Sequence, residues 1–240
     1  MRSPGTGRWR ASAASSRRAG AGVNERFAYD VARVGRATLA GADEAGRGCL
    51  AGPLVAAAVC FDYSVLDEAA FDALDGLHDS KRLTPARRAA LYAEVLRRAR
   101  QIVVVCCSPG TIDREGLHHC NLGSLAGAVE GISPAAAVTL VDGFRLPGCR
   151  VPHEAVIGGD GRSAAIAAAS VVAKVTRDRV MHRLHAAHPQ YGFDRHVGYA
   201  TQVHQDAIVA HGVCELHRLS FASVTYLQLG LALGADPPSP

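Results

Sequence analysis

Hydrophobic runs and amphipathic stretches alternate along most of the chain. The run PLVAAAVCF is uninterrupted, which is typical of a strand that is buried on both faces. Shorter apolar runs bounded by polar residues predict further strands. Strands are expected at residues 38–43, 53–61, 101–107, 137–142 and 154–157.

Helices are predicted between these strands and in the C-terminal third. Thr84 is a suitable N-cap with Pro85 in the first turn, and Pro189 ends the longest helical stretch. Strands that alternate with helices, followed by helices alone, predict an α/β layer with a helical C-terminal region. The helical segments are expected at about 84–100, 111–131, 162–188, 198–211 and 221–233.

The two ends of the chain lack a hydrophobic period. Residues 1–26 are rich in Gly, Ser, Ala and Arg, so a disordered tail is expected there, with a second tail at 234–240 and the ordered domain at 27–233. The first segment holds six arginines and one glutamate, a charge of +5; since the whole chain carries +4, residues 27–240 carry −1. Nucleic-acid binding by the folded part would therefore require a local basic patch.

Cysteine usage points to a reducing compartment. The chain has seven cysteines and no CxxC motif, so neither a disulfide framework nor a zinc ribbon is indicated, and we expect a cytoplasmic protein with free thiols. No apolar run reaches the roughly 18 residues of a membrane-spanning helix. A zinc protein is the alternative suggested by two His/Cys clusters, but neither has four-ligand spacing. The clusters are His211, Cys214 and His217, and His118, His119 and Cys120.

Acidic residues recur where apolar strands end. Asp43 and Glu44 close the first predicted strand, Asp142 closes the AVTLVD strand, and Asp160 precedes the longest helix. Strand ends form the rim of a sheet, where α/β proteins build their sites. The chain has only two lysines to pair with such acids, Lys81 and Lys174. All-oxygen donors without basic partners favour Mg²⁺ or Mn²⁺.

A glycine-rich turn follows the first two acids. Gly46 and Gly48 flank Arg47, and glycines let a backbone approach a ligand closely and expose its amides. A strand rather than a helix follows, so the turn does not fit a dinucleotide-binding fingerprint. These residues alone leave two interpretations of the turn open: a site for a sugar or phosphate beside the acids, or a simple tight turn.

Six motifs in order resemble the ribonuclease HII family, the type 2 ribonucleases H. They cover roughly residues 36–224, and agreement at six ordered places is specific. The motifs are GADEAGRGCLAGPLVAAAV (41–59), DSKRLTPARRAALY (79–92), VDG (from Asp142), GDGRSAAIAAASVVAKVTRDRVM (159–181), GYAT (around Tyr199) and LHRLSF (216–221).

This resemblance implies an RNase H-like mixed sheet flanked by helices, with a C-terminal helical region. The family's four active-site carboxylates match Asp43, Glu44, Asp142 and Asp160. It also implies two-metal phosphodiester hydrolysis with Mg²⁺ or Mn²⁺, giving a 5′-phosphate and a 3′-hydroxyl. The substrates implied are RNA–DNA hybrids and duplex DNA that contains single ribonucleotides, and the protein would be a monomer with replication or repair proteins as partners.

The resemblance also implies substrate contacts. The backbone of Gly46, Arg47 and Gly48 matches the family's sensor of the ribose 2′-hydroxyl, the group that distinguishes RNA from DNA. Tyr199 matches a tyrosine that packs on the sugar at the RNA–DNA junction. Contacts with backbone phosphates are expected from Ser80, Lys81, Lys174 and Arg177.

Two departures and two alternatives accompany the resemblance. Gly159 stands where many members carry lysine, and the segment 112–129 differs from the family's helix, so no role is assigned to Asn121. Ribonuclease HIII shares the fold, but it adds a folded N-terminal domain and usually has Glu as its fourth acid, where this chain has Asp160. A non-catalytic nucleic-acid-binding module would tolerate loss of an acid, and all four are present.

Overall fold

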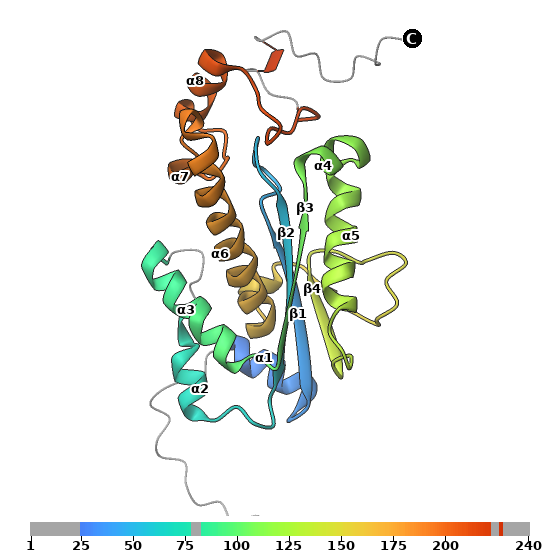
Figure 1. The fold of residues 1–240 in the computed structure, drawn as a ribbon. Helices are drawn as coiled ribbons and strands as arrows, with labels where there is room; N and C mark the ends of the chain where they lie inside the picture. The colour runs from blue at the N-terminus through green and yellow to red at the C-terminus, as the bar shows by residue number, and fades with distance from the viewer. Residues whose placement is uncertain (1–24, 78–82, 222–225, 228–240) are drawn as a thin grey trace, which may run out of the picture.

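The computed structural model describes residues 25–77, 83–221 and 226–227, and a mixed sheet with helices on both faces forms its centre (Figure 1). The strand order is β3-β2-β1-β4-β5. The central strand β1 is antiparallel to β2 and parallel to β4, β2 is antiparallel to β3, and β4 is parallel to β5. The strands are β1 Thr38–Ala45, β2 Leu54–Asp62, β3 Gln101–Cys107, β4 Val138–Asp142 and β5 Glu154–Val156.

Helices cover the sheet in two layers. The long helix α6 lies on one face together with α1 and α3, and α5 lies on the other face (Figure 1). This arrangement confirms the predicted α/β class. The helices are α1 Glu25–Val34, α2 Glu68–Ala73, α3 Pro85–Arg98, α4 Pro109–Glu115, α5 Leu117–Glu130, α6 Ala164–Ala187, α7 Phe193–His196 and α8 Gln202–His211, with short 3₁₀ turns η2 Gly159–Gly161 and η3 Pro189–Tyr191.

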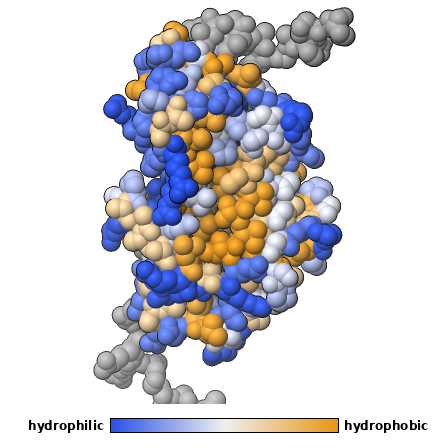
Figure 2. All heavy atoms as spheres, in the orientation of Figure 1, coloured by the Kyte–Doolittle hydropathy of each residue, from blue (hydrophilic) through white to orange (hydrophobic). Residues whose placement is uncertain are grey.

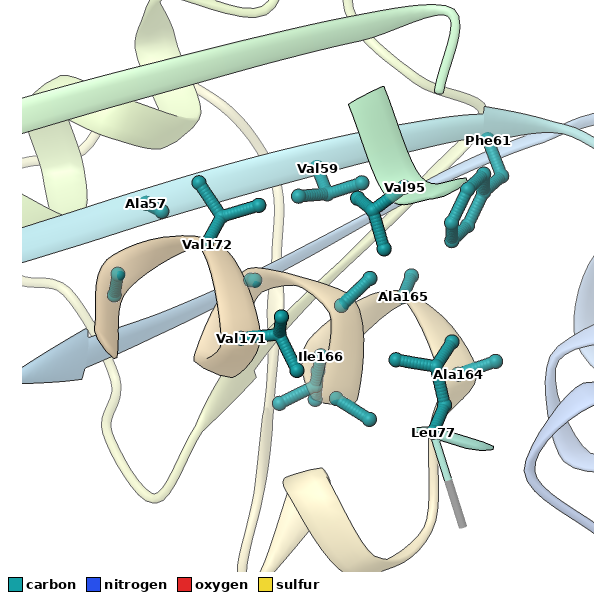
Figure 3. Close-up of a cluster of buried hydrophobic side chains, with 14 of the residues drawn as sticks. Ala57, Val59, Phe61, Leu77, Val95, Ala164, Ala165, Ile166, Val171 and Val172 are labelled. Carbon is teal, nitrogen blue, oxygen red and sulfur yellow. The ribbon is translucent and has the colours of Figure 1, made fainter. Parts of the chain in front are cut away.

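The larger core lies between β2 and the alanine-rich start of α6. Val59 and Phe61 of β2 and Val172 of α6 are fully buried there, and Val95 of α3 joins them (Figure 3). Close approach of α6 to the sheet depends on Gly41 in β1, because an added Cβ would lie 2.2 Å from the backbone of α6. The first turn of α6 therefore lies directly against the central strand.

The edge strand β3 is less well covered. Val104 is 39% exposed, and its neighbours in β3 are only half-buried. Figure 2 shows hydrophobic surface along the middle of this face, between hydrophilic flanks. The apolar sequence of β3 therefore reflects its place in the sheet and not complete burial.

The predicted strands and the longer helices are confirmed with shifts of a few residues. The helix expected at 111–131 is instead two helices, α4 and α5, separated by Gly116 at φ +85°. The short helices α2 and α7 were not predicted. The helix expected at 221–233 falls mostly outside the described residues, as do the tails at 1–24 and 234–240.

Helix α1 corrects the predicted start of the ordered domain. Glu25 and Arg26 form its first turn instead of belonging to a disordered tail. Phe27 is fully buried, and its ring centroid lies 4.9 Å from that of Phe71. The buried carboxylate of Asp30 accepts hydrogen bonds from the Tyr63 hydroxyl (2.6 Å) and from an amide in the first turn of α6 (3.0 Å). Helix α1 thus joins the sheet to the start of α6.

Candidate active site

The four predicted acids lie at one edge of the sheet. Strands β1, β4 and β5 are parallel, so their carboxyl ends meet at this edge. Asp43 and Glu44 lie near the end of β1, Asp142 is the last residue of β4, and Asp160 lies in η2 just after β5. The β1–β4 register pairs Ala42 with Val141, so the next residues, Asp43 and Asp142, are neighbours.

Asp43 and Glu44 both reach this edge although they are adjacent on a strand. The ladder of β1 with β2 continues to Ala45, whereas its ladder with β4 stops at Ala42. Asp43 lies beside Ser170 of α6, and Glu44 faces Asn121 of α5. The free side of β1 beyond Ala42 therefore leaves room for both carboxylates next to Asp142.

Burial makes these carboxylates hard to ionise. Burial raises the pKa of Asp43 to about 8, the Ser170 hydroxyl opposes that rise, and the charges of Glu44 and Asp142 add to it. Burial also raises the pKa of Glu44, although Arg47 at 3.4 Å opposes the rise. Glu44 Oε2 is buried without a hydrogen-bond partner. A divalent cation would supply the missing positive charge, so these residues fit a metal site.

Backbone contacts hold the other two acids. The amide of Gly159 donates to Asp142 Oδ1 at 2.6 Å, which joins η2 to the end of β4. Arg26 Nε of α1 donates to the backbone oxygen of Asp160 at 2.8 Å. No three of the four carboxylates have oxygens within 4.8 Å of one another, so the donor set is wider than one compact shell.

The glycine-rich turn follows Glu44 directly. Gly46 has φ +95°, and an added Cβ would lie 2.1 Å from Arg177 Nε, so both conformation and space require glycine. Gly48 is exposed, with nothing within 4 Å of an added Cβ. The Arg47 guanidinium lies 4.9 Å from the centre of the Phe144 ring. Arg47 and Gly48 are thus exposed next to the acids, whereas Gly46 is buried against Arg177.

A cleft of about 290 Å³ brings several predicted site residues together. Tyr199 is 41% exposed, and Lys174 Nζ lies 5.2 Å from the centre of its ring. Lys174 also forms an ion pair with Asp178 at 2.8 Å. The cleft is lined by Glu44, Ala45, Gly46, Arg88, Ser170, Val171, Lys174 and Tyr199.

The structure gives Arg177 a different position from the predicted one. Its side chain is fully buried, and all three guanidinium nitrogens donate to backbone carbonyls. The expected contact with a backbone phosphate is incompatible with this burial, because no nitrogen faces solvent. Ser80 and Lys81, the other predicted phosphate contacts on the chain's DSKR motif, lie outside the described residues.

Two buried polar residues beside the site were not predicted to belong to it. Arg218 lies in the LHRLSF motif, and its guanidinium also donates only to backbone carbonyls. No spacing in the sequence links it to the glycine-rich turn 170 residues earlier in the chain. The Asn121 side chain is fully buried and lies close enough to Glu44 to oppose the rise in the pKa of that carboxyl, although neither Oδ1 nor Nδ2 makes a hydrogen bond of normal geometry among the described residues.

The histidines and cysteine of the zinc alternative are arranged differently from its prediction. His217 pairs with His204 at 3.2 Å and accepts from the amide of Cys214 at 3.0 Å, so both ring nitrogens are used. His188, Cys214 and Glu215 have donor atoms within 4.8 Å of one another. His188 Nε2 lies 3.3 Å from Glu215 Oε1, a direct contact that brings two of these three groups together without a metal.

Comparison with known proteins assigns the chain to a family. The sequence model described as Ribonuclease HII matches residues 40–224. The Ribonuclease HII of Xanthobacter autotrophicus is 51% identical over 197 residues, which are 82% of this chain and 76% of that protein. The Ribonuclease HII of Geobacillus thermodenitrificans is 47% identical over 199 residues, 83% of this chain and 74% of that protein.

Solved structures share the fold. The ribonuclease H2 of Pyrococcus horikoshii superposes with a TM-score of 0.68 at 24% identity and covers 80% of this chain and 96% of that one. The RNase HII in the PCNA:RNase HII complex of Archaeoglobus fulgidus gives a TM-score of 0.63 at 27% identity, over 75% and 93% of the two chains. Since the family match spans most of the chain and the relatives are about half identical, the chain belongs to the ribonuclease HII family of ribonuclease H enzymes.

Proposed function

We propose that this enzyme hydrolyses the RNA strand of RNA–DNA hybrids and nicks duplex DNA 5′ to a single embedded ribonucleotide, with Asp43, Glu44, Asp142 and Asp160 as metal ligands. The observation that carries the proposal is the group of acids at one sheet edge, where Asp43 and Asp160 are buried and Glu44 Oε2 has no hydrogen-bond partner among the described residues. Burial of a carboxylate such as Asp43 costs stability, and that cost is understandable where function requires a cation.

The donor set favours Mg²⁺ or Mn²⁺. All four candidate ligands offer oxygen, the donor type that Mg²⁺ and Mn²⁺ prefer. A structure of Bst-RNase HIII in complex with Mn²⁺ has the same fold, with a TM-score of 0.64 at 21% identity. When bound, two such ions would activate water for attack on the phosphodiester and stabilise the leaving 3′ oxygen.

The chain's own residues would orient the nucleic acid. The exposed backbone of Arg47 and Gly48 lies beside Glu44 and offers amide donors to a ribose 2′-hydroxyl. Tyr199, in the same cleft, offers a ring face to the neighbouring sugar, and Lys174 adds positive charge. No side-chain nucleophile is required, because the acids position metal and water.

The test is a duplex DNA that carries one ribonucleotide, incubated with enzyme and Mg²⁺ or Mn²⁺, with EDTA as control. A single metal-dependent nick 5′ to the ribonucleotide is expected. Cleavage of long hybrids alone would contradict the junction role of Tyr199. Absence of cleavage with either metal would favour the non-catalytic binding module on the same fold.

A replication or repair partner and a cytoplasmic location complete the proposal. The Archaeoglobus fulgidus neighbour was solved as a complex with PCNA, which supports a sliding clamp as the kind of partner to test. All seven cysteines are free, in keeping with a reducing compartment. Among the described residues, no helix has the length and hydropathy needed to cross a membrane.

A further inference from the structure

Two buried arginines hold the loop between β1 and β2. Arg218 Nη1 donates to the carbonyls of Gly46 (2.7 Å) and Arg47 (3.1 Å), and its Nε and Nη2 donate to Gly52 (3.0 and 2.8 Å). Both ends of the loop are therefore joined through one guanidinium group, 166 to 172 residues away in sequence.

Arg177 holds the same loop from α6. It donates to the carbonyls of Ala51 (3.0 Å) and Pro53 (3.0 Å), and its third nitrogen donates to Val197 (2.8 Å), two residues before Tyr199. Since Arg177 Nε lies where a Cβ of residue 46 would be, this guanidinium also packs directly against Gly46. The glycine-rich loop and the start of the Tyr199 segment thus share one buried support.

These contacts fix the direction of the loop's amides. In a planar trans peptide the C=O and the following N–H point in opposite directions. With the carbonyls of Gly46 and Arg47 turned toward Arg218, the N–H groups of Arg47 and Gly48 point away from it. Neither N–H takes part in a backbone hydrogen bond among the described residues. The two donors belong to adjacent exposed residues, and the Arg47 side chain pairs with Glu44 at 3.4 Å.

The arrangement is costly, and lysine could not reproduce it. Burial, together with the nearby charge of Arg177, lowers the pKa of Arg218 to about 10, because removing two neighbouring cations from water is unfavourable. Lysine would keep a charge but would offer a single nitrogen instead of a planar fork that spans Gly46 and Gly52. A function that needs a fixed loop accounts for two arginines at this place.

We infer that Arg218, supported by Arg177, is a positioning residue that holds the amides of Arg47 and Gly48 as a preformed pair of donors and thereby sets selectivity for ribonucleotides. A ribose 2′-hydroxyl can accept from these donors, whereas deoxyribose has no acceptor there. Because the pair is preformed, binding does not have to offset the conformational entropy that would be lost on ordering the loop. This inference rests on the proposed function for its substrate.

The test compares Arg218→Lys and Arg177→Lys with Arg36→Lys in the full chain. Arg36 is a matched control, because it is exposed and also donates to a backbone carbonyl, that of Ser64 at 2.9 Å, at the opposite end of β1. Four quantities are measured: kcat/KM on a duplex with one ribonucleotide, the Mg²⁺ concentration that half-saturates this reaction, affinity for the same duplex made only of DNA, and hydrogen–deuterium exchange of peptides covering residues 46–53.

For Arg218→Lys, kcat/KM on the ribonucleotide duplex is expected to fall by about tenfold or more, with affinity for the all-DNA duplex and half-saturating Mg²⁺ unchanged. Exchange at 46–53 should accelerate, and Arg36→Lys should match the wild type. A folded Arg218→Lys with wild-type kcat/KM and exchange would overturn the inference. If Arg218→Lys loses its cooperative melting transition, the test passes to Arg177→Lys. That variant must then show the lower kcat/KM and the faster exchange at 46–53, or the inference fails. If the wild type cuts neither the ribonucleotide duplex nor an RNA–DNA hybrid, the proposed function is refuted. The exchange comparison would still decide whether the arginines position the loop.

Discussion

At the scale of single residues, ionisation of the buried Asp43 lowers stability, although the proposed function requires its charged form. Its pKa is about 8 in the folded protein and near 3.8 without the fold, so folding favours the protonated form. The stability that this protonation contributes is fully present below the unfolded pKa and is lost as pH rises to about 8. The metal-free enzyme should therefore be destabilised toward alkaline pH relative to Asp43→Asn.

Asp43→Asn should raise the unfolding free energy of the metal-free protein by on the order of a few kcal/mol at pH 8–9 and change it little near pH 4. It should lower cleavage by about a hundredfold or more if Asp43 is a metal ligand, as proposed above. Urea unfolding at several pH values and single-turnover rates measure both. Mg²⁺ should stabilise the wild type and not the variant; equal stabilisation of both would contradict ligation by Asp43.

The acids of the candidate site could be predicted from the sequence, whereas the arginines that hold the loop beside them could not. Asp43 and Asp142 follow apolar strands, a pattern visible without a structure, and parallel pairing brings them together. Arg177 was expected to face the substrate because its place on a long helix does not reveal which side is covered. Arg218 was missed because its partners are backbone carbonyls, which leave no mark on the sequence.

At the scale of elements, two buried histidines tie α8 to the segment that carries Arg218. His204 Nδ1 donates to the Tyr199 carbonyl at 2.9 Å, so its Nε2 accepts from His217 Nε2 at 3.2 Å. His217 Nδ1 is then free to accept from the amide of Cys214. This chain of hydrogen bonds requires both rings to be neutral.

Burial lowers the pKa of His204 and of His217 to about 4, below the ordinary value of 6.5. Their contribution to stability is complete above pH 6.5 and is lost as pH falls toward 4, on the order of a few kcal/mol for the pair. His204→Gln should be less stable at pH 7.5 but should show a flatter loss of stability between pH 6.5 and 4. The exposed His211→Gln serves as control, and an unchanged slope in His204→Gln would refute this origin.

Element boundaries depended on whether the deciding force was local. Strand β3 has its own apolar run, and helix α3 has its own apolar pattern and N-cap; both were predicted closely. Helix α1 was missed because only Phe27 and Asp30 are fully buried on it, and their partners lie on β2 and α6. The break at Gly116 was missed because glycine weakens a helix without dictating where it ends.

At the scale of the whole molecule, α1 closes the core and also touches the site through Arg26. Deleting residues 1–34 removes buried Phe27 and the Asp30 contact with α6, so we expect a loss of several kcal/mol in unfolding free energy. Phe27→Ala alone should cost about 3–5 kcal/mol.

Deleting residues 1–24 should instead leave the melting temperature unchanged, because α1 begins at Glu25. That segment carries five arginines and no acid, so its loss should weaken nucleic-acid binding mainly at low salt and reduce the salt dependence of affinity, without moving the cleavage position. Melting curves and binding titrations from low to physiological salt distinguish the two deletions. A large stability loss on removing 1–24 would show that the folded core extends beyond α1, and unchanged salt dependence would show that these arginines do not contact the nucleic acid.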